Sequence, residues 1–153
     1  MPEPLEMTVT SADDLLALDR QVCFALAVAS RNVIALYRPL LEPMGLTHPQ
    51  YLVMLALWED SPLTVKRLSE LLALDPGTLS PLLKRLEAVG YVTRQRDPRD
   101  ERALAVTLTE SGRALREEAL KIPPAIISRL GMSLPELESL HTALTQVIKA
   151  AAK

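Results

Sequence analysis

The single cysteine of the chain, Cys23, is the residue with the greatest capacity for covalent chemistry. The thiolate is the reactive form of cysteine, and it can be oxidised. A lone cysteine between Val22 and Phe24 in a helical pattern is by default a small buried hydrophobe, and apolar burial would suppress its reactivity. Because one cysteine cannot form an internal disulfide, the composition fits a reducing cytoplasm.

Basic side chains form the second group, and their chemistry is the binding of phosphate. The net charge of −2 argues weakly against a nucleic-acid partner. Residues 64–106, however, hold eight bases against six acids, whereas the rest of the chain holds nine bases against thirteen acids. The bases therefore concentrate in one stretch, although the bias is modest.

That stretch begins with an expected helix-turn-helix. The segment TVKRLSELL opens on a possible cap at Thr64, and its apolar residues repeat at helical spacing. In DPGTLSPLLKRLEAVG, Asp75 is the expected N-cap and Gly90 the stop. The dipeptide Ser80-Pro81 leaves a later start for this second helix open.

Side chains near the start of the second helix can reach base edges in a DNA major groove, while its backbone N–H groups meet phosphate. The candidates on this helix are Asp75, Gly77, Thr78, Ser80, Lys84 and Arg85. The alternative is a solvated helix face behind an ordinary N-cap.

A β-hairpin is expected next, because YVTRQ and LAVTL alternate apolar and polar residues on either side of the loop RDPRDERA. Its tip would probe a minor groove. The candidates on this wing are Arg94, Arg96, Arg99, Asp100 and Arg102. The Asp100 carboxylate could hold the Arg102 guanidinium extended toward a narrow groove, or the two could form an ordinary turn salt bridge.

The remaining segments are predicted to form helices around this module. We expect a polar leader over 1–11, a helix from about Asp13 to Leu41, a helix starting at Pro49, a helix from Thr109 that breaks at Pro123-Pro124, and a last helix with a Ser133/Glu136 capping box. The predicted fold is mainly α with a small β-hairpin wing (α+β), as one domain over 1–153. It consists of a winged helix-turn-helix at 48–108 and dimerisation helices at 12–42 and 109–151.

Both terminal helical regions are apolar beyond what the winged module needs to cover. They carry Leu15, Leu16, Leu18, Val22, Phe24 and Leu26 in one, and Leu134, Leu137, Leu140, Leu144, Val147 and Ile148 in the other. Two copies packing these ends together would form a homodimer with two recognition helices, as a palindromic operator requires. No run is expected to reach the length of a membrane span, and the acidic N-terminus does not resemble a signal peptide.

A family resemblance covers nearly the whole chain from Val22 onward. It rests on CFAL (23–26), ASR (29–31), LYRPLL (36–41), PQYL (49–52), LD (74–75), GTL (77–79), PLLKRLE (81–87) and DER (100–102). In order and spacing these segments resemble the organic hydroperoxide resistance regulators, a branch of the multiple-antibiotic-resistance-regulator (MarR) family. Generic MarR members usually lack the cysteine with its tyrosine and LYRPLL segment.

The resemblance implies a dimeric winged-helix repressor whose reduced form binds its operator and whose oxidised cysteine, after further thiol chemistry, releases it. By position, Cys23 would be the peroxidatic cysteine and Tyr37 a phenol that hydrogen-bonds it, with Tyr51 nearby. Arg102 matches the family's minor-groove arginine and Asp100 the acid that positions it. The resemblance also favours a recognition helix that starts near Asp75.

Two positions depart from that pattern. Many relatives carry tyrosines where this chain has Ala27 and His48, so the phenol network around the sulfur would be thinner. A protonated His48 could stabilise a thiolate, or it could merely precede a helix. With no second cysteine, the sulfenic acid would form a mixed disulfide with a small cellular thiol or be over-oxidised.

Helix geometry adds a hypothesis about the dimer. Cys23 and Tyr37 are fourteen residues apart, so on a straight helix they would lie about 21 Å apart and could not touch within one subunit. An antiparallel pair of first helices that crosses near Ser30, where Ala27 and Ala29 are also small, would bring Cys23 against the partner's Tyr37.

Three other functions are alternatives to a peroxide-sensing repressor. A small aromatic ligand bound between the dimerisation and DNA-binding parts could release DNA, with Cys23 structural. A turnover peroxidase lacks a resolving cysteine, and His48 and His141 form no recognisable triad or metal-ligand pair. A pure protein–protein module would leave the wing arginines unexplained. We expect no cofactor and no metal.

Overall fold

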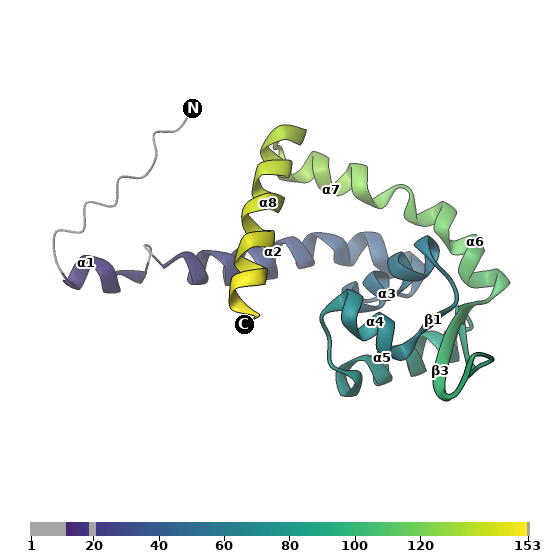
Figure 1. The fold of residues 1–153 in the computed structure, drawn as a ribbon. Helices are drawn as coiled ribbons and strands as arrows, with labels where there is room; N and C mark the ends of the chain where they lie inside the picture. Colours follow the sequence, from purple (N-terminus) through teal and green to yellow (C-terminus); the bar gives the residue numbers. More distant parts are fainter. Residues whose placement is uncertain (1–11, 19–20, 153) are drawn as a thin grey trace. The chain divides into compact units, whose positions relative to one another are not determined.

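The computed structural model describes residues 12–18 and 21–152, and it is mainly helical with one small antiparallel sheet, as expected (Figure 1). Its elements in chain order are α1 (Ala12–Leu16), α2 (Val22–Leu41), η2 (Glu42–Met44), α3 (His48–Glu59), β1 (Leu63–Thr64), α4 (Val65–Leu72), α5 (Pro76–Val89), β2 (Val92–Asp97), β3 (Asp100–Leu108), α6 (Glu110–Ala119), α7 (Ile122–Leu130) and α8 (Leu134–Ala151). The described residues fall into two parts, one ending at Leu36 and one beginning at Tyr37. The expected polar leader lies outside the described residues.

The expected single helix over 13–41 is wrong, because α1 and α2 are separate helices. The side-chain amide of Gln21 donates to the carbonyl oxygens of Leu15 at 2.6 Å and Ala17 at 3.2 Å. These bonds satisfy carbonyl groups that a continuing helix would have bonded through its own backbone. Gln21 therefore caps the end of α1, and α2 starts afresh after it.

The expectation that no run approaches a membrane span also needs correction. Among the described residues, the stretch Val22–Met44 is long and apolar enough to cross a membrane by length and composition, with a mean hydropathy of 1.2. Arg31 and Arg38 interrupt it, and charged side chains are costly inside a bilayer. A helix that is buried in a soluble protein meets the same criteria of length and hydropathy, so this is weak evidence for a membrane-spanning helix.

The helix-turn-helix forms at the expected caps. The Thr64 hydroxyl accepts the Arg67 N–H at 3.0 Å at the start of α4, and Asp75 caps α5. Gly90 ends α5 in the left-handed conformation with φ 96°, which glycine adopts without strain. Helix α5 continues through Pro81, so the alternative start at that proline is not adopted.

The wing is longer than the sequence pattern indicates. The predicted eight-residue loop over 96–103 is wrong, because β2 and β3 pair up to Asp97↔Asp100 and leave only Pro98 and Arg99 at the tip, with an irregularity at Arg96/Asp97. A short third strand, β1, was not expected. It pairs with β3 through Leu63↔Val106, which gives the sheet order β1-β3-β2.

A leucine-rich core joins the winged module together. Helices α3, α4 and α5 pack on one another and against the sheet, as Figure 1 shows. Its almost fully buried side chains include Leu57, Leu68, Leu79, Leu83, Leu86, Val92 and Val106. Burial of each such side chain contributes about 1.5–3 kcal/mol, so this core fixes how α5 and the wing are presented.

Two predictions for the C-terminal helices are confirmed, and the position of one of them differs slightly. The Ser133/Glu136 capping box forms at the start of α8. The expected break at Pro123-Pro124 occurs, but α6 has already ended at Ala119 and the prolines lie in the first turn of α7, where a missing N–H costs nothing.

Candidate DNA-binding surface and redox site

Asp75 is the N-cap of α5. One carboxylate oxygen, Oδ1, accepts the Thr78 N–H at 2.9 Å, and the other, Oδ2, accepts the Thr78 hydroxyl at 2.9 Å. These two bonds lower the pKa of Asp75. A Cβ on Gly77 would lie 3.1 Å from Asp75 Oδ1, so the small residue leaves room for the cap. Asp75 and Gly77 thus shape the end of the helix.

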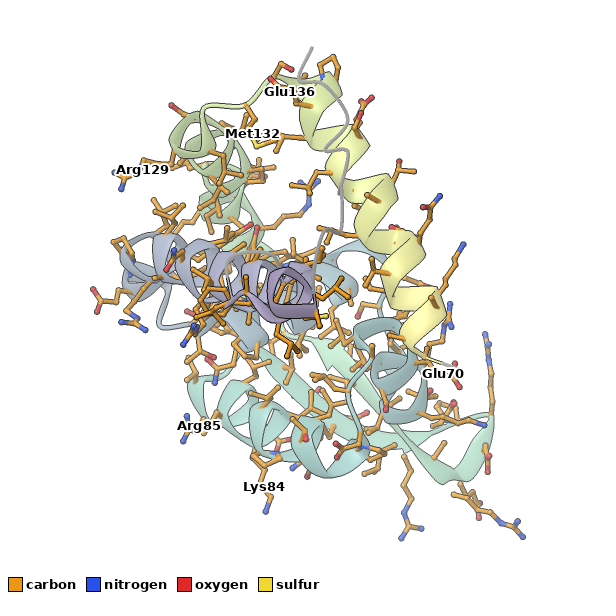
Figure 2. The ribbon with its side chains drawn as sticks, turned by 90° about the vertical axis from the view of Figure 1, so that its left-hand side faces the viewer. Glu70, Lys84, Arg85, Arg129, Met132 and Glu136 are labelled. Atoms are coloured by element: carbon orange, nitrogen blue, oxygen red, sulfur yellow. The ribbon has the colours of Figure 1, made fainter. Side chains whose placement is uncertain are left out.

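The outer face of α5 carries the expected bases. Leu79, Leu83 and Leu86 are buried on its inner side, whereas Lys84 and Arg85 are exposed. Figure 2 shows both basic side chains projecting outward from α5, and neither makes an ion pair with the described residues. Thr78 is exposed and Ser80 is half-buried near the N-terminal end of the same helix.

The arginines of the wing fall into two groups, exposed and paired. Arg96, Arg99 and Arg102 are exposed, and the described part of the chain offers them no ion pair. Arg94 differs: its Nη2 lies 3.4 Å from Glu87 Oε1, and its side chain is only 19% exposed. The wing therefore presents three arginines outward and holds a fourth against α5.

Asp100 acts on the backbone of Arg102. Its Oδ1 accepts the Arg102 N–H at 3.0 Å, and no ion pair joins its carboxylate to the Arg102 guanidinium in the described structure. Asp97 accepts the Arg99 N–H at 2.9 Å in the same way. Both are Asx turns, in which a short carboxylate fixes the chain two residues on. The sequence prediction overlooked Asp97, although Asp before Pro is a recognised turn signal.

Three of the candidate sensor residues form an aromatic cluster. The ring centroids of Tyr37 and His48 lie 4.8 Å apart in an edge-on arrangement, and those of Tyr37 and Tyr51 lie 5.8 Å apart. Burial raises the pKa of Tyr37, and burial followed by the Tyr37 charge raises the pKa of Tyr51. Burial lowers the pKa of His48, which disfavours the imidazolium form that an electrostatic role toward a thiolate needs.

A pH dependence of stability follows from His48. Its pKa is lower in the folded than in the unfolded protein, so its stabilising contribution is complete above about pH 6.5 and is lost as the pH falls through the folded-state pKa. The variant His48→Gln should therefore lose less stability between pH 7.5 and 5.5 than the wild type, measured by urea unfolding. His141→Gln, in exposed α8, is the matched control, and equal losses in all three proteins would contradict the prediction.

Cys23 is exposed on α2 in the single chain, unlike a cysteine that serves as core packing. Tyr37 lies on the same helix, which runs without interruption from Val22 to Leu41. Apolar side chains around the cysteine are also exposed, including Val22 at 67% and Phe24 at 42%.

Comparisons with known proteins agree with this fold. The family model "Transcriptional regulator SarA/Rot" matches residues 35–119. The chain is 43% identical over 136 residues to the organic hydroperoxide resistance transcriptional regulator of Bacillus subtilis, covering 89% of this chain and 92% of the relative. The structure of reduced AbfR bound to DNA, a protein of Staphylococcus epidermidis, matches with a TM-score of 0.77 and 34% identity, covering 94% of this chain and 100% of that one. Apo MarR of Escherichia coli, at 24% identity and a TM-score of 0.68 over 83% of this chain and 96% of that one, shares the fold.

The helix-turn-helix, the hairpin beside it and these matches define a winged helix-turn-helix transcription regulator, not an enzyme. More narrowly, the chain belongs to the MarR family, in the branch of the organic hydroperoxide resistance regulators.

Proposed function

We propose that the chain is a cytoplasmic, homodimeric repressor that binds a palindromic operator when Cys23 is reduced and releases it when an organic hydroperoxide oxidises Cys23. The observation that carries the proposal is the exposed thiol of Cys23 on the long apolar helix α2. The Bacillus subtilis relative is named for organic hydroperoxide resistance, which supports an organic hydroperoxide as the inducer. The AbfR structures support a redox-sensitive regulator that binds DNA.

In this proposal α5 enters the major groove and the wing reaches the adjacent minor groove. Thr78, Ser80, Lys84 and Arg85 face the DNA from α5, while Asp75 and Gly77 set its N-terminus. From the wing, Arg96, Arg99 and Arg102 face the DNA, and Asp100 fixes the backbone that carries Arg102. This division of roles rests on which side chains are exposed, apart from Ser80, which is half-buried.

The two apolar ends supply the dimer interface. On α8, Leu134 is 61% and Ile148 is 63% exposed, and on α2 Ile34 is 40% exposed. Such surfaces need a partner, and a symmetric copy of the chain is the simplest one. If the two α2 helices cross near Ser30, Cys23 of one protomer lies against the partner's Tyr37.

The proposed chemistry has two balanced steps. The Cys23 thiolate attacks the distal peroxide oxygen, the O–O bond breaks, and the products are Cys–SOH and the alcohol ROH after protonation. A small thiol R′SH then attacks the sulfenic sulfur, giving Cys–S–SR′ and water. AbfR has been solved in an overoxidised form bound to DNA, which favours the bulkier mixed disulfide over further oxidation as the species that releases the operator here.

A mobility-shift assay with DNA from upstream of its own gene tests the proposal. Cumene hydroperoxide together with a small thiol should abolish the shifted band, and excess dithiothreitol should restore it, because thiol exchange returns Cys–SH. A band that survives peroxide and thiol, or a protein that does not bind the DNA at all, would contradict the proposal.

A second candidate function keeps the fold but replaces oxidation with ligand binding. It is favoured by a cavity of about 300 Å³ lined mainly by apolar and aromatic groups, including Tyr51, Leu55, Trp58 and Pro123. Its charged lining residues are Glu59 and Arg116. A small aromatic ligand would fit such a cavity. Release by that ligand would be reversed by dilution and would not respond to dithiothreitol.

A further inference from the structure

We propose that Glu87 and Arg94 form a clamp that locks the wing to the recognition helix, which makes Glu87 a positioning residue for operator binding. The proposal rests on the DNA-binding function proposed above. It also changes the role of Arg94, which sequence reasoning placed among the residues that contact DNA.

The clamp has two contacts that converge on one carboxylate. Glu87, in the last turn of α5, accepts the backbone N–H of Arg94 through Oε2 at 3.1 Å. Its other oxygen, Oε1, lies 3.4 Å from Nη2 of the same arginine. One side chain of the helix thus holds both the backbone and the side chain of one residue in β2.

The backbone contact matters because β2 is an edge strand. In the order β1-β3-β2, strand β2 pairs only with β3, where Arg94 lies opposite Val106. The Arg94 N–H points to the open side and donates to Glu87. An open strand edge leaves such donors unpaired, so the carboxylate supplies the partner that a further strand would have supplied.

The side-chain contact sets Arg94 apart from the other bases of the module. Its side chain is 19% exposed and is paired, whereas Lys84, Arg85, Arg96, Arg99 and Arg102 are exposed without an ion pair among the described residues. The Arg94 charge is directed at Glu87. It is therefore not the charge that neutralises a phosphate.

A rigid link between helix and wing has a direct consequence for binding. A helix in the major groove and a hairpin in the minor groove must fit the duplex at the same time, and a loose hairpin would lose conformational entropy on binding. Fixing the two before binding removes that cost. The clamp lies where the last turn of α5 passes the third residue of β2, so it controls the angle at which the wing leaves the helix.

The variant Glu87→Gln tests the clamp through the direction in which operator affinity changes. Glutamine has the same size and still accepts the Arg94 N–H, but it lacks the charge that attracts the guanidinium. Removing a negative charge near DNA should strengthen operator binding if only long-range electrostatics matters. The clamp predicts the reverse: about tenfold weaker binding, or about 1.4 kcal/mol, with an unchanged melting temperature.

Arg94→Gln and the matched control Arg96→Gln complete the design. If Arg94 is a positioning residue, its variant weakens binding like Glu87→Gln, the double variant is no weaker than either, and the slope of log K against log salt stays at the wild-type value. Arg96→Gln should reduce that slope by about 0.9, as expected for one lost phosphate contact. Hydroxyl-radical footprints of Glu87→Gln should lose protection in the minor groove next to the wing, while protection of the backbone that flanks α5 remains.

Each outcome bears on one claim. Unchanged or stronger binding by Glu87→Gln, or a reduced salt slope with additive losses for Arg94→Gln, would overturn the clamp. If the wild-type protein does not bind the operator at all, the proposed function fails instead. A melting temperature that falls in step with affinity would overturn the positioning role in favour of a general loss of stability.

Discussion

Replacing Cys23 with serine is expected to leave operator binding intact and to abolish release by cumene hydroperoxide. The substitution exchanges one exposed atom on α2, so neither α5 nor the wing should move. It removes the nucleophile, because a serine hydroxyl does not attack a peroxide O–O bond at neutral pH. Shifting an operator from almost fully bound to almost fully free takes a change in affinity of about 10⁴-fold. The variant should lose that whole response in a fluorescence-anisotropy titration.

The methionines provide the matched control for this experiment, because peroxides also oxidise thioethers. Met44 and Met54 are buried, whereas Met132, in the turn between α7 and α8, is half-buried and is labelled in Figure 2. Met132→Leu should therefore retain full release by peroxide. Release of Cys23→Ser at the wild-type dose, or loss of release in Met132→Leu, would contradict the assignment of the sensor to Cys23.

Local signals explain the parts of the fold that the sequence predicted correctly. Thr64, Asp75 and Ser133 are small oxygen-bearing residues whose side chains bond the backbone three residues on, so each helix start depends only on neighbours in the sequence. Pro81 was ambiguous by the same rules. The helix continues through Pro81, with Leu79 and Leu83 buried on either side of it in the sequence.

Contacts between distant residues explain what the sequence could not predict. The end of α1 depends on the Gln21 amide, whose carbonyl partners carry no sequence signature. The wing was predicted too short because charged residues over 96–103 hide the alternation of a hairpin that is exposed on both faces. Arg94 was grouped with the DNA-contacting bases by charge alone, since its pairing with Glu87 becomes apparent only when α5 meets β2.

The same limitation applies to the redox residues. The sequence placed Tyr37, His48 and Tyr51 together, and the three rings are indeed neighbours. It could not give the environment of His48, whose pKa is lowered by burial. The roles of these residues at the Cys23 sulfur remain part of the proposal.

The largest effect on stability is expected from Gly112→Ala, at a glycine that sequence reasoning did not single out. Alanine is the better helix former by about 1 kcal/mol, so propensity alone predicts a more stable α6. The packing predicts the opposite. A Cβ at Gly112 would lie 2.1 Å from the carbonyl oxygen of Tyr91 and 3.0 Å from its carbonyl carbon, and backbone atoms cannot rotate away as a side chain can.

The free-energy cost of the steric clash should therefore exceed the stability gained from the higher helix propensity of alanine. Overpacking typically costs about 1–3 kcal/mol, and a clash with backbone lies at the upper end or beyond, so we expect a net loss of about 2 kcal/mol or more. The clash would also displace the Thr109 N–H, which donates to the same Tyr91 oxygen at 3.0 Å, and so loosen the junction between the wing and α6. Urea unfolding measures the loss, and Ser111→Ala in the same turn is the matched control.

The only tryptophan of the chain reports on the same contact. Trp58 Nε1 donates to the Gly112 carbonyl oxygen at 2.9 Å, so a shift of α6 away from Tyr91 should break this bond and move the emission of Trp58. Because the ring lies in α3, the spectral change would show that the displacement is felt across the α3–α6 contact before the protein unfolds. A melting temperature at or above that of the wild type, with unchanged Trp58 emission, would mean that α6 accommodates the methyl group and that the close approach of Gly112 to Tyr91 does not hold the wing in place.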